Sequence, residues 1–270
     1  MTKWLKGSEL RGYLMERQAR QVRNLRQEHK IFPKLLIIMS ENASDAIRTY
    51  VRMKQRYAAD ILIDVEVAEL PQTDIAERIR QANDDESIQG IIVQLPLQNP
   101  AQTDEICDLI APEKDVDGLG KFARFPSATA QAIDWLLAGY CVDLDDKKIA
   151  IVGQGKLVGA PLTHMWRERK LAVTTFDETT SLDDLAQFDV IVTATGVPRL
   201  ITSEKVKRGA VVVDAGTASE SGKLIGDVAD DVRLRDDLTI TPEKGGVGPL
   251  TYVVLFDRLV EVCLRLAGKL

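Results

Sequence analysis

Tyr50 and Lys54 are residues whose types and spacing could do chemistry. They stand four positions apart in a segment rich in helix formers, so they share one face of the expected helix. A lysine in a partly dry site loses its proton more easily than in water and can then accept one. The spacing therefore predicts an amine beside an aromatic ring on one helix face, and the alternative is an ordinary surface pair.

Gln94 and Asp117 are two further candidates, and both stand where turns are expected. Gln94 directly follows the apolar run 90–93, and Asp117 lies in the polar turn 112–118. Ligands of open α/β sheets bind beyond the carboxyl ends of the strands, where Gln94 is expected. The alternatives are a strand-end cap for Gln94 and an Asx turn with Gly118 for Asp117.

A glycine-rich turn follows the strand expected at 148–152 and opens a helix. It consists of Gly153, Gln154, Gly155, Lys156, Leu157, Val158 and Gly159. Glycine lets backbone N–H groups approach a pyrophosphate, and the helix N-terminus adds a favourable dipole. The turn predicts a nicotinamide dinucleotide site, and the alternative is a tight turn that binds nothing.

Acidic residues end the next expected strand, where Asp177 and Glu178 follow Phe176. A carboxylate there can accept hydrogen bonds from the adenosine ribose of NAD and would repel the extra phosphate of NADP. No lysine or arginine occurs between Lys170 and Arg199. NAD is therefore favoured over NADP, and the alternative is that the carboxylate only caps its loop.

Hydrophobic periodicity places these residues on alternating helices and strands. Helices are expected at 8–28, with Ser8 as N-cap, and at 44–57, 73–83, 129–138, from the glycine turn to 169, and 250–266. Strands are expected at 35–39, 61–67, 90–93, 148–152, 172–176, 190–192 and 210–213. Such alternation predicts an α/β fold with parallel sheets. The two α/β blocks are expected to meet at 119–127.

Composition narrows the class of protein further. The chain has 270 residues, 45% hydrophobic and 28% charged, and no apolar run long enough for a membrane span. A net charge of −6 argues against nucleic acid as a partner, although residues 1–60 carry 13 Lys/Arg against 6 Asp/Glu. The three cysteines form no CxxC pair, so we expect a reduced, cytoplasmic protein without a bound metal.

Taken together in this order, the motifs resemble the methylenetetrahydrofolate dehydrogenase/cyclohydrolase family. The motifs YVxxK, VQLPL, PEKDVDG and GGVGPxT begin at Tyr50, Val93, Pro112 and Gly245, and the GxxKxVGxP turn begins at Gly153. The resemblance covers nearly the whole chain. It implies an α/β catalytic domain at 1–122, completed by the helix at 250–270, and a Rossmann-type NAD(P)-binding domain at 123–249, with a cleft between them and a homodimer.

The resemblance also implies the reaction and the roles of the residues. Methylenetetrahydrofolate is oxidised with a nicotinamide cofactor, and the methenyl product is then hydrolysed to formyltetrahydrofolate. Lys54 is the catalytic amine, Gln94 holds it, Tyr50 packs on the folate ring, and Asp117 bonds the pterin. Further substrate-binding residues are Leu95, Pro96, Gly245, Gly246 and Pro249. Cofactor-binding residues are the seven from Gly153 to Gly159, Asp177, Glu178, Thr195 and Gly196.

Departures from the family pattern leave two alternatives. Only seven residues separate Gly118 from Pro126, where the family usually has some twenty, and the PCTP segment reads PSAT from Pro126. Gln154 and Glu178 stand where the family often has an arginine and a serine that meet the NADP phosphate, which agrees with NAD. The shortened segment leaves the hydrolytic step open. The alternatives are a dehydrogenase of the same fold on another pterin-like substrate and a non-catalytic NAD-binding regulator.

Overall fold

A computed structural model describes residues 2–220 and 223–270 of the chain. It divides into two compact units. One, the three-stranded unit, comprises Gly12–Ala128 and Tyr252–Leu270, and the other, the six-stranded unit, comprises Met1–Arg11 and Thr129–Thr251. No helix among the described residues is both long and apolar enough to cross a bilayer.

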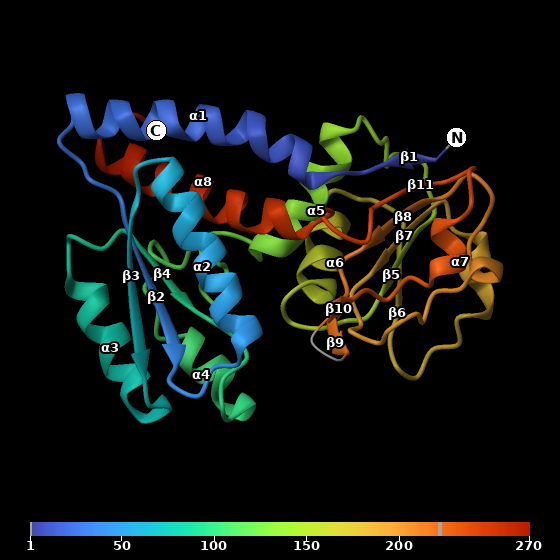
Figure 1. Cartoon of the computed structure of the whole chain (residues 1–270), viewed down its shortest axis with the longest axis horizontal. Helices are drawn as coiled ribbons and strands as arrows, with labels where there is room; N and C mark the ends of the chain where they lie inside the picture. The colour runs from blue at the N-terminus through green and yellow to red at the C-terminus, as the bar shows by residue number, and fades with distance from the viewer. Residues whose placement is uncertain (1, 221–222) are drawn as a thin grey trace. The chain divides into compact units, whose positions relative to one another are not determined.

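The three-stranded unit is a parallel sheet with crossover helices (Figure 1). Its strands lie in the order β3-β2-β4 and are joined by helices, as the alternating pattern predicted. The strands are β2 (Lys34–Ser40), β3 (Asp64–Leu70) and β4 (Gly90–Val93). The helices are α1 (Gly7–Glu28), α2 (Asp45–Asp60), α3 (Gln72–Asp84), α4 (Thr103–Cys107) and most of α8 (Gly248–Leu266), with a short 3-10 turn at Pro100–Gln102.

Alternate side chains of β2 point to opposite faces of this sheet, and both faces are covered. Leu36 and Ile38 pack with Ile75 and Ile79 of α3 in one buried cluster. On the other face, Gly90 of β4 lies so close to Leu259 of α8 that an added Cβ would come within 2.9 Å of it. Burial on both faces explains why β2 reads as a continuous apolar run.

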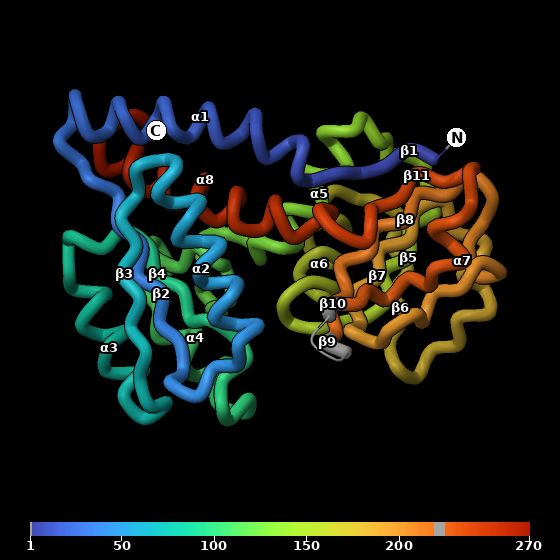
Figure 2. Tube along the Cα trace, in the orientation of Figure 1, coloured from blue at the N-terminus to red at the C-terminus, as the bar shows by residue number. Residues whose placement is uncertain are grey.

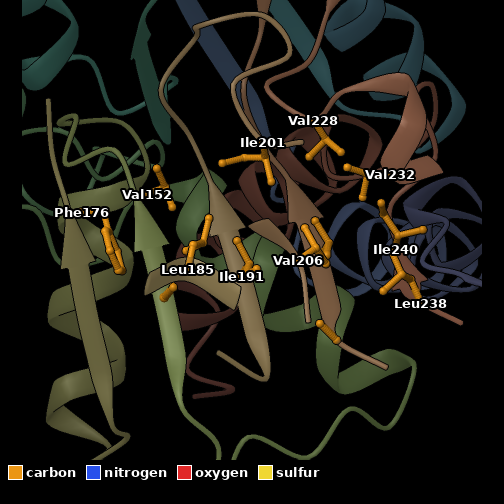
Figure 3. Close-up of a cluster of buried hydrophobic side chains, with 13 residues drawn as sticks. Val152, Phe176, Leu185, Ile191, Ile201, Val206, Val228, Val232, Leu238 and Ile240 are labelled. Atoms are coloured by element: carbon orange, nitrogen blue, oxygen red, sulfur yellow. The ribbon is translucent and has the colours of Figure 1, made fainter. Parts of the chain in front are cut away.

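The six-stranded unit is a second parallel sheet, ordered β1-β11-β8-β7-β5-β6. Its strands are β1 (Lys3–Trp4), β5 (Ile149–Val152), β6 (Val173–Phe176), β7 (Val190–Thr193), β8 (Val211–Asp214) and β11 (Thr239–Ile240). The other elements are α5 (Ala128–Gly139), α6 (Gly159–Glu168), α7 (Asp230–Arg233), the antiparallel pair β9 (Ala218–Glu220) and β10 (Lys223–Ile225), and 3-10 turns at Asp183–Gln187 and Ser203–Lys205. Figure 3 shows its core, a cluster of buried side chains that includes Val152, Ile191 and Ile240.

The N-terminal residues belong to the six-stranded unit, whereas the sequence analysis placed them with the first α/β block. Lys3 and Trp4 form β1, which pairs in parallel with Thr239 and Ile240 of β11 (Figure 2). A two-residue strand is too short to show any periodicity, so only the long-range pairing reveals it. The units divide at Ala128 and Thr129, just after the predicted junction at 119–127.

Two local predictions were wrong. β3 begins at Asp64 rather than at residue 61, because Ile61 ends α2 by donating its N–H to the carbonyls of Tyr57 and Ala58. Ile61 is apolar because it is buried at the end of α2, not because it belongs to the strand. Ser8 lies inside α1 instead of capping it, because the helix begins at Gly7 and the Ser8 N–H bonds the Gly245 carbonyl at 3.1 Å.

Candidate active site

A buried lysine and a glutamine form the centre of the candidate site. Lys54 lies on α2, a helix whose N-cap Ser44 accepts a hydrogen bond from the Ile47 N–H. The Lys54 side chain is 8% exposed, and its Nζ donates to Gln94 Oε1 at 2.8 Å. Gln94 is held at the carboxyl end of β4, where its N–H bonds the Ile38 carbonyl. The structure thus brings together the two residues that the sequence analysis paired.

Burial changes the electrostatics of this pair. Desolvation lowers the pKa of Lys54, and the nearby negative charge of Asp117 acts in the opposite direction. Tyr50 lies one helical turn before Lys54 and is half-buried, and its burial raises the pKa of its hydroxyl. A lysine with a lowered pKa holds a neutral amine at a lower pH than a free lysine does, which a proton acceptor requires.

The turn that carries Asp117 is built by its neighbours. Asp115 is 1% exposed, and its carboxylate accepts the backbone N–H groups of Gly118, Leu119 and Gly120 at 2.8–3.1 Å. The same desolvation raises the pKa of Asp115, against the effect of these hydrogen bonds. Lys114 donates to three carbonyls at the end of α3. The side chains of Asp115 and Lys114 thus fix the turn. Asp117, which directly precedes Gly118, is half-buried, and its negative charge acts on Lys54.

Glycine is required at the end of this turn. Gly118 has φ +72°, and an added Cβ would lie 2.2 Å from the Pro126 carbonyl oxygen and 2.6 Å from that of Phe125. The Asp117 carbonyl accepts a hydrogen bond from Ala128 N at 2.9 Å. The shortened segment after Gly118 is therefore packed tightly against the turn.

Leu95 and Pro96 continue from Gln94 at the same strand end. They are joined by a cis peptide bond, and Gln94 Nε2 donates to the Leu95 carbonyl at 3.3 Å. Leu95 is half-buried and Pro96 is exposed. The segment predicted to contact substrate thus has a surface next to the Lys54–Gln94 pair.

The glycine-rich turn fits a dinucleotide. Gly153 has φ +92°, and a Cβ on Gly159 would come within 1.8 Å of the Gly153 carbonyl oxygen. A Cβ on Gly155 would meet no described atom within 4 Å, which leaves room for a ligand. None of the described side chains caps the N-terminus of α6. These features suit a pyrophosphate, which binds backbone N–H groups and the positive end of a helix dipole.

The rest of this turn differs in exposure. Lys156 and Leu157 lie at its surface, whereas Val158, the residue before α6, is half-buried. Gln154 folds back onto the protein: its Nε2 donates to the Gly153 carbonyl, and its Oε1 accepts from Thr163 Oγ1 at 3.2 Å. The glutamine therefore sets the shape of the turn rather than reaching into solvent.

Asp177 stands where β6 ends, followed by the exposed Glu178. Its Oδ1 accepts hydrogen bonds from Thr179 N, Thr179 Oγ1 and Thr180 Oγ1 at 2.7–3.0 Å, and these bonds lower the pKa of Asp177. The loop-capping interaction weighed in the sequence analysis is therefore present. It keeps the carboxylate ionised at neutral pH, the state that accepts hydrogen bonds from a ribose.

The remaining predicted residues lie in loops of the six-stranded unit. Thr195 follows β7 and donates its N–H to the buried carboxylate of Asp227 at 2.6 Å, and Gly196 has φ +70°. Gly245 has φ +83°, and the backbone of Gly246 lies against Gly7. Pro249 is in the first turn of α8. Tyr50, Lys54, Gln94, Leu95, Pro96 and Asp117, in contrast, belong to the three-stranded unit.

Comparison with known protein families decides the class of protein. The family profile described as "Tetrahydrofolate dehydrogenase/cyclohydrolase, catalytic domain" matches residues 5–117, and the profile of its NAD(P)-binding domain matches residues 127–267. The chain belongs to the tetrahydrofolate dehydrogenase/cyclohydrolase family. The family, the two-domain α/β fold and the nicotinamide cofactor that the sequence predicted are thereby confirmed.

Relatives and solved structures of this family match the chain over almost its whole length. The "Bifunctional protein FolD" of Streptococcus suis is 36% identical over 97% of this chain and 96% of the relative. The crystal structure of the FolD enzyme from Campylobacter jejuni has a TM-score of 0.91 and 30% identity over 98% of this chain and 99% of its own. The Trypanosoma brucei enzyme, solved with NADP and an inhibitor, has a TM-score of 0.90 and 28% identity over 98% of each chain.

One charged residue in this member of the family escaped the sequence analysis. Arg258 of α8 is 2% exposed, and its Nη1 donates to the Val116 carbonyl at 2.9 Å. The available signal was its place on an apolar helix face, one turn after Val254 and Leu255. Asp115 was also missed as the organiser of the turn, because a carboxylate that accepts backbone N–H groups has no spacing of its own.

Proposed function

We propose that the chain oxidises methylenetetrahydrofolate to methenyltetrahydrofolate and hydrolyses that product to formyltetrahydrofolate, with Lys54 as the central amine. The observation that carries the proposal is the buried Lys54 Nζ, bonded to Gln94 at 2.8 Å. Family membership supports both reactions.

The hydrolytic step uses Lys54 as a proton acceptor. The methenyl product is a cation whose charged carbon is flanked by nitrogens, so water can add to it. As the new C–O bond forms, the water proton passes to the neutral Nζ of Lys54. The carbon–nitrogen bond of the ring then breaks: the ring nitrogen keeps the bonding electron pair and takes up a proton, while the added hydroxyl loses its own proton to become the formyl C=O. Gln94 orients Nζ through a neutral amide. It adds no negative charge that would favour the protonated form of Lys54 before the reaction.

In the oxidative step, the side chains mainly align the folate with the nicotinamide ring and take no part in bond changes. When bound, the nicotinamide cofactor accepts the hydride of the methylene group. We propose that Tyr50 packs on the folate ring, that Asp117 accepts a hydrogen bond from the pterin, and that Leu95 and Pro96 shape the substrate surface of the three-stranded unit. The loop of Gly245, Gly246 and Pro249 is a separate proposed substrate contact in the six-stranded unit. Holding two rings in register can lower the barrier by several kcal/mol.

NAD is the proposed cofactor. Asp177 is ionised and ends β6, where a carboxylate accepts hydrogen bonds from the two free hydroxyls of a ribose and repels a phosphate. Gln154 brings no positive charge to the turn and is folded onto Gly153. The competing cofactor is NADP, which the Trypanosoma brucei structure contains.

A second candidate function is oxidation of another pterin-like substrate without the hydrolytic step. The observation that favours it is the shortened segment after Gly118, where Phe122 is 69% exposed and Lys121 lies over its ring. This surface differs from the longer segment of the family and could admit a different ligand.

We also propose a homodimer in the cytoplasm. The outer edge of β3 is not paired with any strand among the described residues, so it is open to a second chain. Cys107, Cys141 and Cys263 form no disulfide bond in the part of the chain that the structure describes, which suits a reducing compartment. Light scattering of the purified protein coupled to size-exclusion chromatography measures the mass directly, and a monomer would contradict the dimer.

The catalytic proposal is tested by mixing the protein with methylenetetrahydrofolate and NAD or NADP, and following reduced cofactor and methenyl product by absorbance. Lys54→Met keeps the length of the side chain and removes the amine, and Lys269→Met removes an exposed lysine outside every proposed site as control. We expect Lys54→Met to bind cofactor but lose hydrolysis, and Lys269→Met to match the unaltered enzyme. Full hydrolysis by Lys54→Met would refute the role of Lys54. NAD binding without turnover on any folate would favour a regulator.

A further inference from the structure

A buried arginine stands behind the turn that carries Asp117. Besides its bond to the Val116 carbonyl, the Arg258 guanidinium lies over the Phe125 ring, 5.3 Å from its centroid. Burial lowers the pKa of Arg258 to about 10, so it still carries its charge at pH 7. Burying a charge in this way is costly unless other charges compensate it.

Four carboxylates act on Arg258 from two elements: Asp117 and Asp115 from the turn, and Asp257 and Glu261 from its own helix. Asp257 also has Arg17 as an ion-pair partner, and Glu261 has Arg265. Asp115 accepts three backbone N–H groups. Asp117 is the largest of the four influences on Arg258, and it is also the charged group that acts on Lys54.

Asp117 therefore faces two buried cations with opposite requirements. A carboxylate beside Lys54 favours the protonated amine, which would remove the proton acceptor that hydrolysis needs. A fixed positive charge beside the same carboxylate offsets that effect, because the pair together exerts a weaker field than the carboxylate alone. Arginine suits this purpose, since it keeps its proton where a buried lysine often loses it.

We propose that Arg258 is a positioning residue that balances the charge of Asp117 and so keeps the Lys54 amine in the neutral form at working pH. It does so while its guanidinium holds the Val116 carbonyl, and because Arg258 is 2% exposed it need not touch substrate. This role rests on the proposed function of Lys54.

Competitive acetylation with acetic anhydride, read by mass spectrometry at the Lys54 peptide over a range of pH, tests the proposal without any turnover. Arg258→Gln removes the charge and keeps a donor for the Val116 carbonyl. We expect the pKa of Lys54 to rise by about one unit in this variant. Arg258→Lys, which retains a cation, should leave it close to the original value. Arg80→Gln, which removes an exposed arginine of α3 that pairs with Glu77, is the control and should leave it unchanged.

No rise in Arg258→Gln, or an equal rise in Arg258→Lys and Arg258→Gln, would overturn the proposal, because the charge would then not matter. If Arg258→Gln does not fold, Arg258→Met gives the same comparison. The acid limb of the hydrolysis profile should move to higher pH in step with the labelling. If the unaltered enzyme hydrolyses no methenyltetrahydrofolate, the proposed function fails, while the labelling still decides what Arg258 does to Lys54.

Discussion

Gly118→Ala should destabilise the three-stranded unit and disturb the position of Asp117. The φ of +72° places any other residue in the left-handed region, which costs ~1–2 kcal/mol. The new Cβ would lie 2.2 Å and 2.6 Å from two backbone carbonyl oxygens that cannot move without shifting the segment at Phe125 and Pro126. Overpacking of this kind adds ~1–3 kcal/mol.

The sum is a loss of about 3 kcal/mol, which corresponds to a fall of about 10 °C in the thermal midpoint of a domain of this size. Calorimetry measures the midpoint, and the KM for methylenetetrahydrofolate should rise because the turn carries Asp117. Gly12→Ala is the matched control. It lies within α1, and its Cβ would meet no described atom within 4 Å, so we expect a gain of ~0.5–1 kcal/mol. An unchanged midpoint in Gly118→Ala, or an equal fall in Gly12→Ala, would refute the reasoning.

Three other predictions concern the cofactor turn and Lys54. Gly155→Ala places a Cβ where no described protein atom lies within 4 Å, so titration calorimetry should show cofactor binding weakened at least about tenfold with an unchanged midpoint; unchanged affinity would mean that the ligand lies elsewhere. Asp177→Ser should shift the ratio of kcat/KM about tenfold toward NADP, and a constant ratio would remove Asp177 from the choice of cofactor. Lys54→Met should abolish a rise in stability that occurs as the pH increases toward 10.5, the ordinary pKa of a lysine. The pKa of Lys54 is lower in the folded protein than in the unfolded chain. Between these two values the unfolded chain binds more protons than the folded protein, so raising the pH disfavours the unfolded chain and stabilises the fold. The prediction would be contradicted if the midpoint of urea unfolding changed with pH equally in Lys54→Met and in the unaltered protein.

Strong local patterns made much of the fold predictable. The continuous apolar run of β2 and the amphipathic spacing of α2 reflect burial that each element achieves with near neighbours. β1 and β11 escaped prediction, because a two-residue strand shows no periodicity and is defined only by its pairing: β1 pairs with β11 across more than two hundred positions, and β11 also pairs with β8.

The candidate site likewise contains residues that the sequence could predict and residues that it could not. Lys54 and Gln94 could be paired through the family resemblance, because the motifs YVxxK and VQLPL that carry them are both present, and the structure joins the two side chains by a hydrogen bond. Arg258 could not be found, because a single arginine in an apolar helix looks the same whether it reaches solvent or a buried carbonyl. Its position is decided by how α8 packs on the turn at Val116, which is a property of tertiary structure.

The pH dependence of Lys54 labelling in the unaltered protein tests the central claim most directly. Because burial lowers the pKa of this amine, competitive acetylation should find a value below the ordinary lysine pKa of 10.5, and the acid limb of the hydrolysis rate should follow the same curve. A Lys54 with the ordinary lysine pKa, together with a hydrolysis rate independent of its titration, would contradict a neutral amine as the proton acceptor.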